Sequence, residues 1–98
     1  MNHYRASIHG KNFIVNLDGR KQKLGFYTTH FVLAEDPESA ELRAVQLLRE
    51  RQSLRNQVQN SVNDPPEVFV EEIVELATFE GIDNLETGLV WYDPDSDE

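Results

Sequence analysis

The chain has 98 residues, no cysteine and a formal net charge of -9. This length favours one hydrophobic core, and the lack of cysteine excludes both a disulfide framework and a thiolate zinc site. Because the amino terminus has no apolar signal segment and no stretch reaches the roughly 18 apolar residues of a membrane span, we expect a cytoplasmic protein.

The charge is unevenly distributed along the chain. Residues 1–33 carry +4, residues 34–63 carry -1 and residues 64–98 carry -12. Such a division can mark a basic binding face and an acidic tail. It also arises when acidic and basic strands lie side by side in one sheet, where opposite charges stabilise the pairing. We favour the second interpretation.

The first third of the chain is rich in strand patterns. Residues Asn2–His9 alternate between apolar and polar, which predicts a half-buried strand. Gly10–Asn12 predicts a turn, and Phe13–Leu17 resumes the alternation up to the hairpin signal Asp18-Gly19. The aromatic and β-branched run Leu24–Ala34 then predicts a third strand.

A helix is predicted to follow. Asp36 suits the N-cap and Pro37 the first helical position. We expect this helix to extend to about Ser53, with a stripe of apolar residues on one face: Ala40, Ala44, Leu47 and Leu48. The amide-rich segment Gln52–Asn63 predicts a frayed helix end and a loop, and Pro65-Pro66 excludes helix beyond it.

The carboxyl-terminal third contains one ambiguous segment. Val68–Phe79 suits either a helix or a strand with a bulge at Glu71-Glu72, and we favour the strand. Leu89–Tyr92 predicts a short strand, and the acidic residues 93–98 predict a disordered tail. The sequence therefore predicts a single domain over residues 1–92.

These elements predict an α+β fold, an antiparallel sheet of four to five strands in the chain order β-β-β-α-β-β with one long helix on one face. The third strand is apolar on both sides, with Phe26 and Val32 on one and Phe31 and Leu33 on the other. A sheet of this size is roughly 20 Å wide, whereas one helix covers only about 10 Å. We therefore predict a homodimer that covers the second face. The alternative is that residues 52–64 or the carboxyl-terminal segment fold over it.

No catalytic, metal or nucleotide motif stands out. His3 and His9 would lie roughly 20 Å apart along one strand and cannot share a metal ion. A catalytic or metal role for His30, with a glutamate from Glu71, Glu72 or Glu75, is weighed against a histidine bonded to a neighbour in the sheet, which we favour.

The acidic end resembles the start of a calcium loop only in part. Asp93, Asp95 and Asp97 have the spacing of such a loop, but its central glycine and closing glutamate are absent. We therefore expect no metal and no cofactor.

Two sets of residues remain as candidates for binding. A small ligand would use Tyr27, His30 and Trp91, with a pocket at the dimer seam. Nucleic acid would use the basic residues of the first strands, although the net charge of -9 opposes phosphate binding: Arg5, Lys11, Arg20, Lys21 and Lys23.

The runs Gly25–Thr29, Ala34–Ala40, Val70–Ile73 and Gly88–Tyr92 resemble small uncharacterised bacterial proteins, a domain family of unknown function. This resemblance implies a compact α+β domain without an assigned activity, and it carries over no site residues. The order β-β-β-α-β is also similar to that of HicB-type antitoxin domains, whose fold resembles double-stranded-RNA-binding domains. The Pro and Gly pattern of the antitoxin hairpin is missing here.

Three hypotheses follow. The first is a non-enzymatic, dimeric interaction or regulatory module of the bacterial cytoplasm that meets a protein partner. The second is a small-ligand binder or enzyme, and the third is a nucleic-acid binder. The sequence identifies neither the substrate, the partner nor the pathway.

Overall fold

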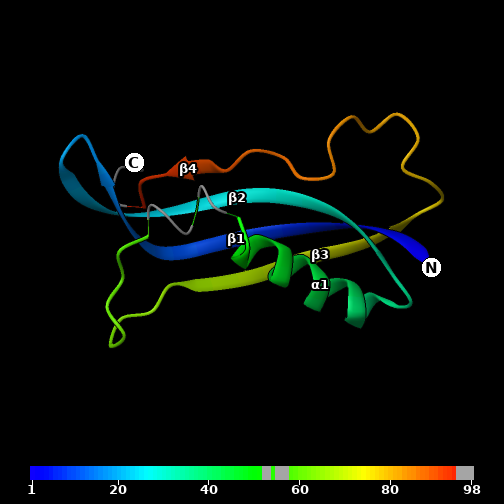
Figure 1. The fold of residues 1–98 in the computed structure, drawn as a ribbon, viewed down its shortest axis with the longest axis horizontal. Helices are drawn as coiled ribbons and strands as arrows, with labels where there is room; N and C mark the ends of the chain where they lie inside the picture. Colours follow the sequence, from blue (N-terminus) through cyan, green and yellow to red (C-terminus); the bar gives the residue numbers. More distant parts are fainter. Residues whose placement is uncertain (52–53, 55–57, 95–98) are drawn as a thin grey trace.

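The computed structural model describes residues 1–51, 54 and 58–94, and in that part of the chain one four-stranded antiparallel sheet packs against one helix (Figure 1). The order of the strands across the sheet is β3-β1-β2-β4. The predicted α+β class is therefore confirmed. The elements in chain order are β1 (Asn2–Leu17), β2 (Arg20–Ala34), α1 (Pro37–Arg49), β3 (Glu67–Leu76) and β4 (Val90–Tyr92).

The first two predicted strands are one strand. Residues Gly10–Asn12 do not turn the chain back; they form a bulge, and β1 continues along β2 on either side of it. Gly10 pairs with Phe26 and Phe13 pairs with Leu24, so two residues of β1 lie opposite one residue of β2. The chain order is thus β-β-α-β-β, and the prediction of a third strand before the helix is wrong. A bulge and a turn both favour Gly and Asn, because both need unusual backbone angles, and Asn12 has a φ of 60°.

The bulge is held by the amide-rich segment between α1 and β3. Asn60 Oδ1 accepts a hydrogen bond from Ile14 N (2.9 Å), and Asn60 Nδ2 donates to Asn12 O (2.7 Å). Asn12 Nδ2 in turn donates to Asp64 Oδ1 (2.8 Å). Of the segment that we predicted as a frayed helix end and loop, residues 52–53 and 55–57 lie outside the described residues.

The helix begins as predicted. Asp36 is the N-cap, and its carboxylate accepts a hydrogen bond from Ser39 N (2.7 Å), which lowers the pKa of Asp36. Pro37 occupies the first turn, where its missing donor costs nothing. The helix ends at Arg49, earlier than predicted, and the predicted end at Ser53 lies outside the described residues.

The ambiguous segment is a strand, as predicted. Along β3, Ser7 pairs with Glu72 and Ile8 pairs with Val70, so Glu71 is an extra residue and forms the predicted bulge. The short strand near the carboxyl terminus is also confirmed, since β4 pairs with Gly25–Tyr27 of β2. The disordered tail stays a prediction, because residues 95–98 lie outside the described residues.

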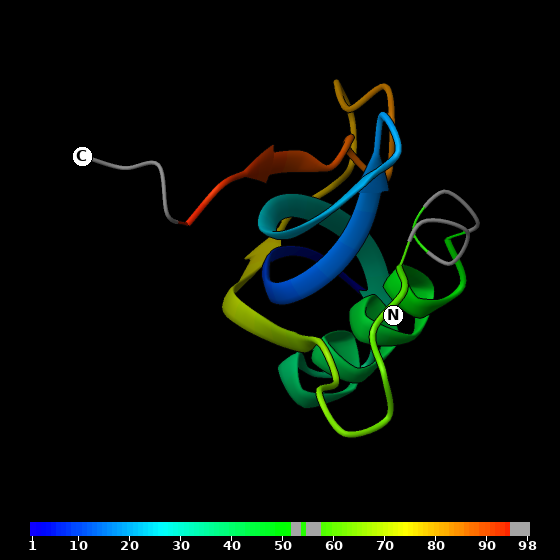
Figure 2. The same cartoon turned by 90° about the vertical axis from the view of Figure 1, so that its left-hand side faces the viewer.

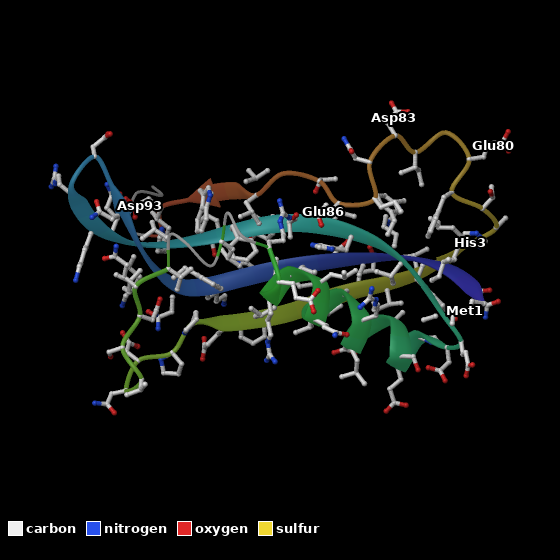
Figure 3. All side chains as sticks on the ribbon, in the orientation of Figure 1. Met1, His3, Glu80, Asp83, Glu86 and Asp93 are labelled. Carbon is white, nitrogen blue, oxygen red and sulfur yellow. The ribbon has the colours of Figure 1, made fainter. Side chains whose placement is uncertain are left out.

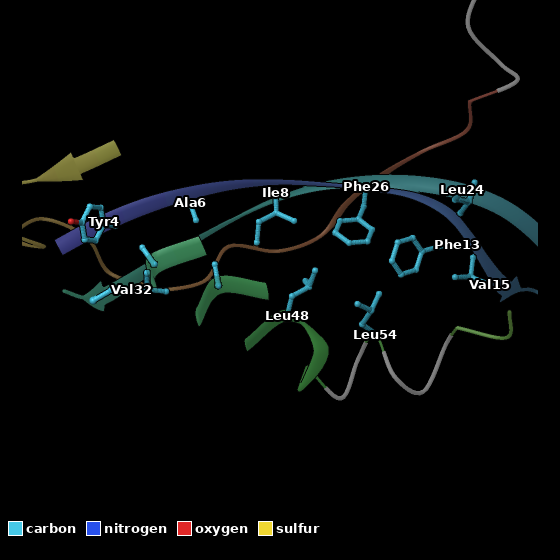
Figure 4. Close-up of a cluster of buried hydrophobic side chains, with 13 residues drawn as sticks. Tyr4, Ala6, Ile8, Phe13, Val15, Leu24, Phe26, Val32, Leu48 and Leu54 are labelled. Carbon is cyan, nitrogen blue, oxygen red and sulfur yellow. The ribbon is translucent and has the colours of Figure 1, made fainter. Parts of the chain in front are cut away.

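The hydrophobic core lies between one face of the sheet and α1 (Figure 4). The helix buries Ala40, Ala44 and Leu48 against this face, and Figure 2 shows α1 on one side of the twisted sheet. The remaining buried apolar residues come from the strands and from the segment after the helix: Tyr4, Ala6, Ile8, Phe13, Val15, Leu24, Phe26, Val32, Ala34 and Leu54. A single helix thus covers a single face of the sheet.

Candidate functional site

The face of the sheet turned away from α1 carries exposed apolar side chains, and we call it the open face. The exposed fractions are 47% for Tyr27, 50% for Leu33, 44% for Phe69 and 65% for Val90. Residues of this face alternate with the buried residues of the same strands, as the sequence predicted for β2. The open face therefore combines exposed apolar side chains with charged ones.

One end of the open face is covered by the loop between β3 and β4. The ring of Phe79 lies 4.5 Å from the ring of His3 and 5.9 Å from that of Phe31. The described part of the segment before β3 lies instead beside β1 at Val15, through a bridge with Val58. The rest of the open face has no cover from the described residues of this chain.

Opposite charges lie side by side on the open face. Arg5 on β1 forms an ion pair with Glu72 on β3 (3.3 Å), and Lys11 is paired in register with Glu67. The ammonium group of Lys11 also lies over the Phe69 ring, 5.5 Å from its centroid. The prediction of neighbouring basic and acidic strands is confirmed at these pairs.

A chain of hydrogen bonds joins three strands on the open face. Glu71 Oε2 lies 3.1 Å from His9 Nδ1, and the Tyr92 hydroxyl contacts His9 Nε2. The imidazole is also stacked on Tyr27, with ring centroids 4.4 Å apart and an interplanar angle of 17°. Gly25 makes room for Tyr92, because a methyl group at this position would collide with the tyrosine ring.

The protonation of this chain follows from the surroundings of Tyr92. Burial raises the pKa of Tyr92, and nearby Tyr27 and Glu71 raise it further. The phenol therefore keeps its proton and donates a hydrogen bond to His9 Nε2, while His9 Nδ1 donates a hydrogen bond to Glu71. Since both ring nitrogens have partners within the chain, the arrangement links β1, β3 and β4.

A cavity of about 570 Å³ lies between the end of β2, α1 and the loop that precedes β4. We call it the His30 cavity, because His30 lines it with an exposed fraction of 0%. Neither Nδ1 nor Nε2 of His30 has a hydrogen-bond partner among the described residues. The other lining residues are Met1, Phe31, Val32, Leu33, Arg43, Leu47, Phe79, Leu85 and Glu86.

Among the described residues, two charged side chains line this cavity, and only one of them is paired with an opposite charge. Glu86 Oε1 is paired with Arg51 Nε (3.5 Å), and Figure 3 shows Glu86 on the loop before β4. Arg43 Nη1 donates to the neutral Gln46 Oε1 (3.3 Å). Burial lowers the pKa of His30, while Glu86 raises it and Arg51 lowers it to a smaller extent. The imidazole is therefore neutral at pH 7.

The three residues predicted to bind a small ligand are not brought together. Tyr27 lies on the open face beside His9, whereas His30 lies on the face covered by α1. Trp91 packs against Phe26, with ring centroids 5.3 Å apart, and does not line the His30 cavity. Glu71, which we weighed as a partner of His30, contacts His9 instead.

The five predicted basic residues lie on the two long strands. Arg5 is engaged by Glu72, and Lys11 and Lys23 line a second cavity of about 400 Å³ beside Tyr92. Arg20 and Lys21 are exposed next to the β1–β2 turn. Glu67 also lines the second cavity, so its wall carries both signs of charge.

Sequence reasoning missed most of the residues that line the His30 cavity. Arg43 is not part of the apolar stripe that we predicted for the helix, Phe79 was predicted only as the end of a strand, and Leu85 belongs to a segment without a motif. The partners of His9 were missed as well. Only the pairing of β3 and β4 with the first hairpin brings Glu71 and Tyr92 to that imidazole, and no local pattern in the sequence reports that pairing.

Within residues 1–51, 54 and 58–94, no group of three or more histidine and acidic side chains could hold a metal ion. No helix in this part of the chain is long and apolar enough to cross a membrane. Comparisons of the chain with protein-family models, with curated proteins and with solved structures gave no match.

Proposed function

We propose that the chain is a non-enzymatic, homodimeric interaction module of the bacterial cytoplasm, in which two copies pack open face against open face. The observation that carries this proposal is the exposure of four large apolar side chains on one side of the sheet: Tyr27, Leu33, Phe69 and Val90. The bacterial source and the cellular compartment in this proposal rest on the resemblance to small bacterial proteins.

The size of the open face suits an interface. Three strands at about 4.8 Å spacing and ten residues of length at about 3.3 Å each give roughly 480 Å² of flat area, and the short β4 adds roughly 50 Å² before side-chain relief is added. Stable complexes bury about 800 Å² on each partner, which is of the same order. Two sheets stacked in this way form a sandwich with a separation of about 10 Å.

Charge decides how the two copies are oriented. Acidic residues of the open face lie on β3, at one side of the sheet, and include Glu67 and Glu72, whereas Lys23 lies on β2 toward the other side. A two-fold axis perpendicular to the strands would stack β3 on β3, with acid facing acid. An axis parallel to the strands places β3 of one copy over β4 of the other and β1 over β2, so that the acidic strand faces an uncharged strand. We therefore propose the parallel axis.

The test is the mass of the protein in solution, measured by light scattering coupled to gel filtration. The wild-type chain should show twice the 11.3 kDa of a single copy. Phe69→Asp and Val90→Asp each place a carboxylate in the apolar part of the proposed interface and should give monomers. At Phe69 the new carboxylate lies near Lys11, so the monomer itself should stay folded.

Leu42→Asp is the matched control, because Leu42 is exposed to 70% on α1, away from the open face. This variant should stay dimeric. A wild-type mass of one copy at the highest attainable concentration, or a dimer that only the Leu42 change disrupts, would refute the proposed interface.

A further inference from the structure

We propose that the His30 cavity binds a small organic carboxylate with an apolar body, and that His30 and Arg43 receive the carboxylate group. This site lies at the end of β2, and none of its residues takes part in the chain of hydrogen bonds around His9. The inference goes beyond the proposed dimer, although Leu33 belongs both to the open face and to the wall of this cavity.

The first argument is the state of the His30 side chain. It is fully buried, and both ring nitrogens are without a partner in the described part of the chain. Buried polar atoms in proteins are nearly always hydrogen-bonded, so such an exception calls for a further partner. A neutral imidazole offers one donor and one acceptor, and its N–H can bind a carboxylate oxygen that enters the cavity and displaces the side chains burying the ring.

The second argument is the balance of charge, which favours an anion over a cation. Glu86 is the one carboxylate among the described residues that line the cavity, and Arg51 already neutralises it at 3.5 Å. Arg43 donates only to the neutral Gln46, and no carboxylate among the described residues lies within ion-pair distance of it. A guanidinium group binds a carboxylate through two parallel hydrogen bonds, which makes arginine well suited to this ligand.

The third argument is the character of the remaining walls. Leu47 of α1, Phe31 of β2 and Leu85 of the following loop present apolar surface, and Phe79 adds an aromatic ring. A volume of 570 Å³ lies within the range of about 300–1,000 Å³ typical of small-molecule sites. The walls therefore fit an aliphatic or phenyl-substituted monocarboxylate, whose body displaces water from these side chains.

The test is a titration of the ¹⁵N-labelled full chain with hexanoate, octanoate and 3-phenylpropanoate, followed through the ring nitrogens of His30 in long-range ¹H–¹⁵N spectra. The corresponding alcohols and methyl esters serve as matched ligands without charge. We expect the carboxylates to shift the His30 nitrogens and to bind at least about ten-fold more tightly than the alcohols, because a charge-assisted pair is lost in the latter.

Two variants probe the two halves of the site. Arg43→Gln removes the cation and should weaken hexanoate binding at least about ten-fold, while Arg49→Gln, an exposed arginine on the same helix that does not line this cavity, should leave binding unchanged. Leu85→Trp fills the apolar part and should abolish binding without touching either polar group. Phe69→Asp, which is meant to break the dimer, should keep the affinity, since Phe69 does not line the cavity.

The inference would be overturned by three results. One is that no carboxylate at millimolar concentration shifts the His30 nitrogens. Another is that alcohols and esters bind as well as the acids, or that Arg49→Gln weakens binding as much as Arg43→Gln. The third is that Leu85→Trp leaves the affinity for hexanoate unchanged.

Discussion

Two histidines of neighbouring strands experience opposite environments, and the difference lies in the face on which each side chain falls. His9 points to the open face, where Glu71 and Tyr92 bind its two nitrogens and Tyr27 stacks on the ring. His30 points to the face covered by α1 and has no partner among the described residues. The imidazole of His9 therefore links neighbouring strands, whereas the imidazole of His30 can bind a ligand.

The environment of His30 predicts a dependence of stability on pH. Burial lowers the pKa of His30 below its ordinary value of 6.5, so the unfolded chain takes up a proton at a higher pH than the folded chain does. The contribution of His30 to the free energy of unfolding is thus fully present above pH 6.5 and is lost as the pH falls below it. Urea unfolding between pH 8 and pH 5 should show this loss.

The control is a pair of substitutions. His30→Gln removes the titrating group and should flatten this part of the pH profile, whereas His3→Gln leaves His30 in place and should retain it. Equal pH dependence in the wild-type chain and in His30→Gln would contradict the assignment of the effect to this residue.

At the scale of the elements, alternation along the sequence predicted which residues share a face but not where a strand ends. Asn2–His9 and Phe13–Leu17 were predicted as separate strands, and the structure joins them through a bulge. A Gly and an Asn beside an alternating run fit a reversal and a bulge equally well. Val68–Leu76 was assigned correctly to a strand and its bulge at Glu71 was foreseen, but residues 77–79, the end of the predicted strand, lie beyond β3.

The candidate site was less accessible to prediction than the fold. His30 was named from its residue type alone, yet Arg43, Leu47 and Leu85 reach the same cavity from a helix and a loop. Their meeting depends on the packing of α1 against β2 and on the bridge between His30 and Glu86. These contacts join residues far apart in the sequence, and no local periodicity encodes them.

The packing of α1 gives a prediction at this scale. Leu48 is fully buried between the helix and the sheet, so Leu48→Ala should leave a void and lower the free energy of unfolding by about 2–5 kcal/mol. Leu42→Ala makes the same chemical change at an exposed position of the same helix and should stay within about 0.5 kcal/mol of the wild type. Chemical denaturation measures both. Similar losses for the two variants would mean that α1 does not pack through Leu48.

At the scale of the whole molecule, the uneven charge along the sequence becomes a charge gradient across the sheet. Of the two basic strands β1 and β2, β1 adjoins the acidic strand β3, and Arg5 and Glu72 meet at that boundary. The acidic outer strand is protected against adding a further strand by its charges and by its bulge. The uncovered apolar surface is instead the open face, which favours stacking of sheets over growth at this edge.

A crosslinking experiment tests whether the two copies pack open face against open face. The chain has no cysteine, so a single introduced thiol gives an unambiguous result. Ser7 lies on the open face of β1, one of the two central strands, so a two-fold axis parallel to the strands brings its two copies near one another. Because stacked sheets are about 10 Å apart, too far for a disulfide, the Ser7→Cys variant should be joined by a short bis-maleimide with a reach of about 8–10 Å.

Glu41→Cys, an exposed position on α1, serves as the control and should give no dimer with the same reagent at low protein concentration. Adding Phe69→Asp to the Ser7→Cys chain should abolish its crosslinking, because the carboxylate interrupts the apolar contact that holds the faces together. If the thiols at position 41 react across copies as readily as those at position 7, random collision explains both products. The open face would then bind a partner other than a second copy of this chain.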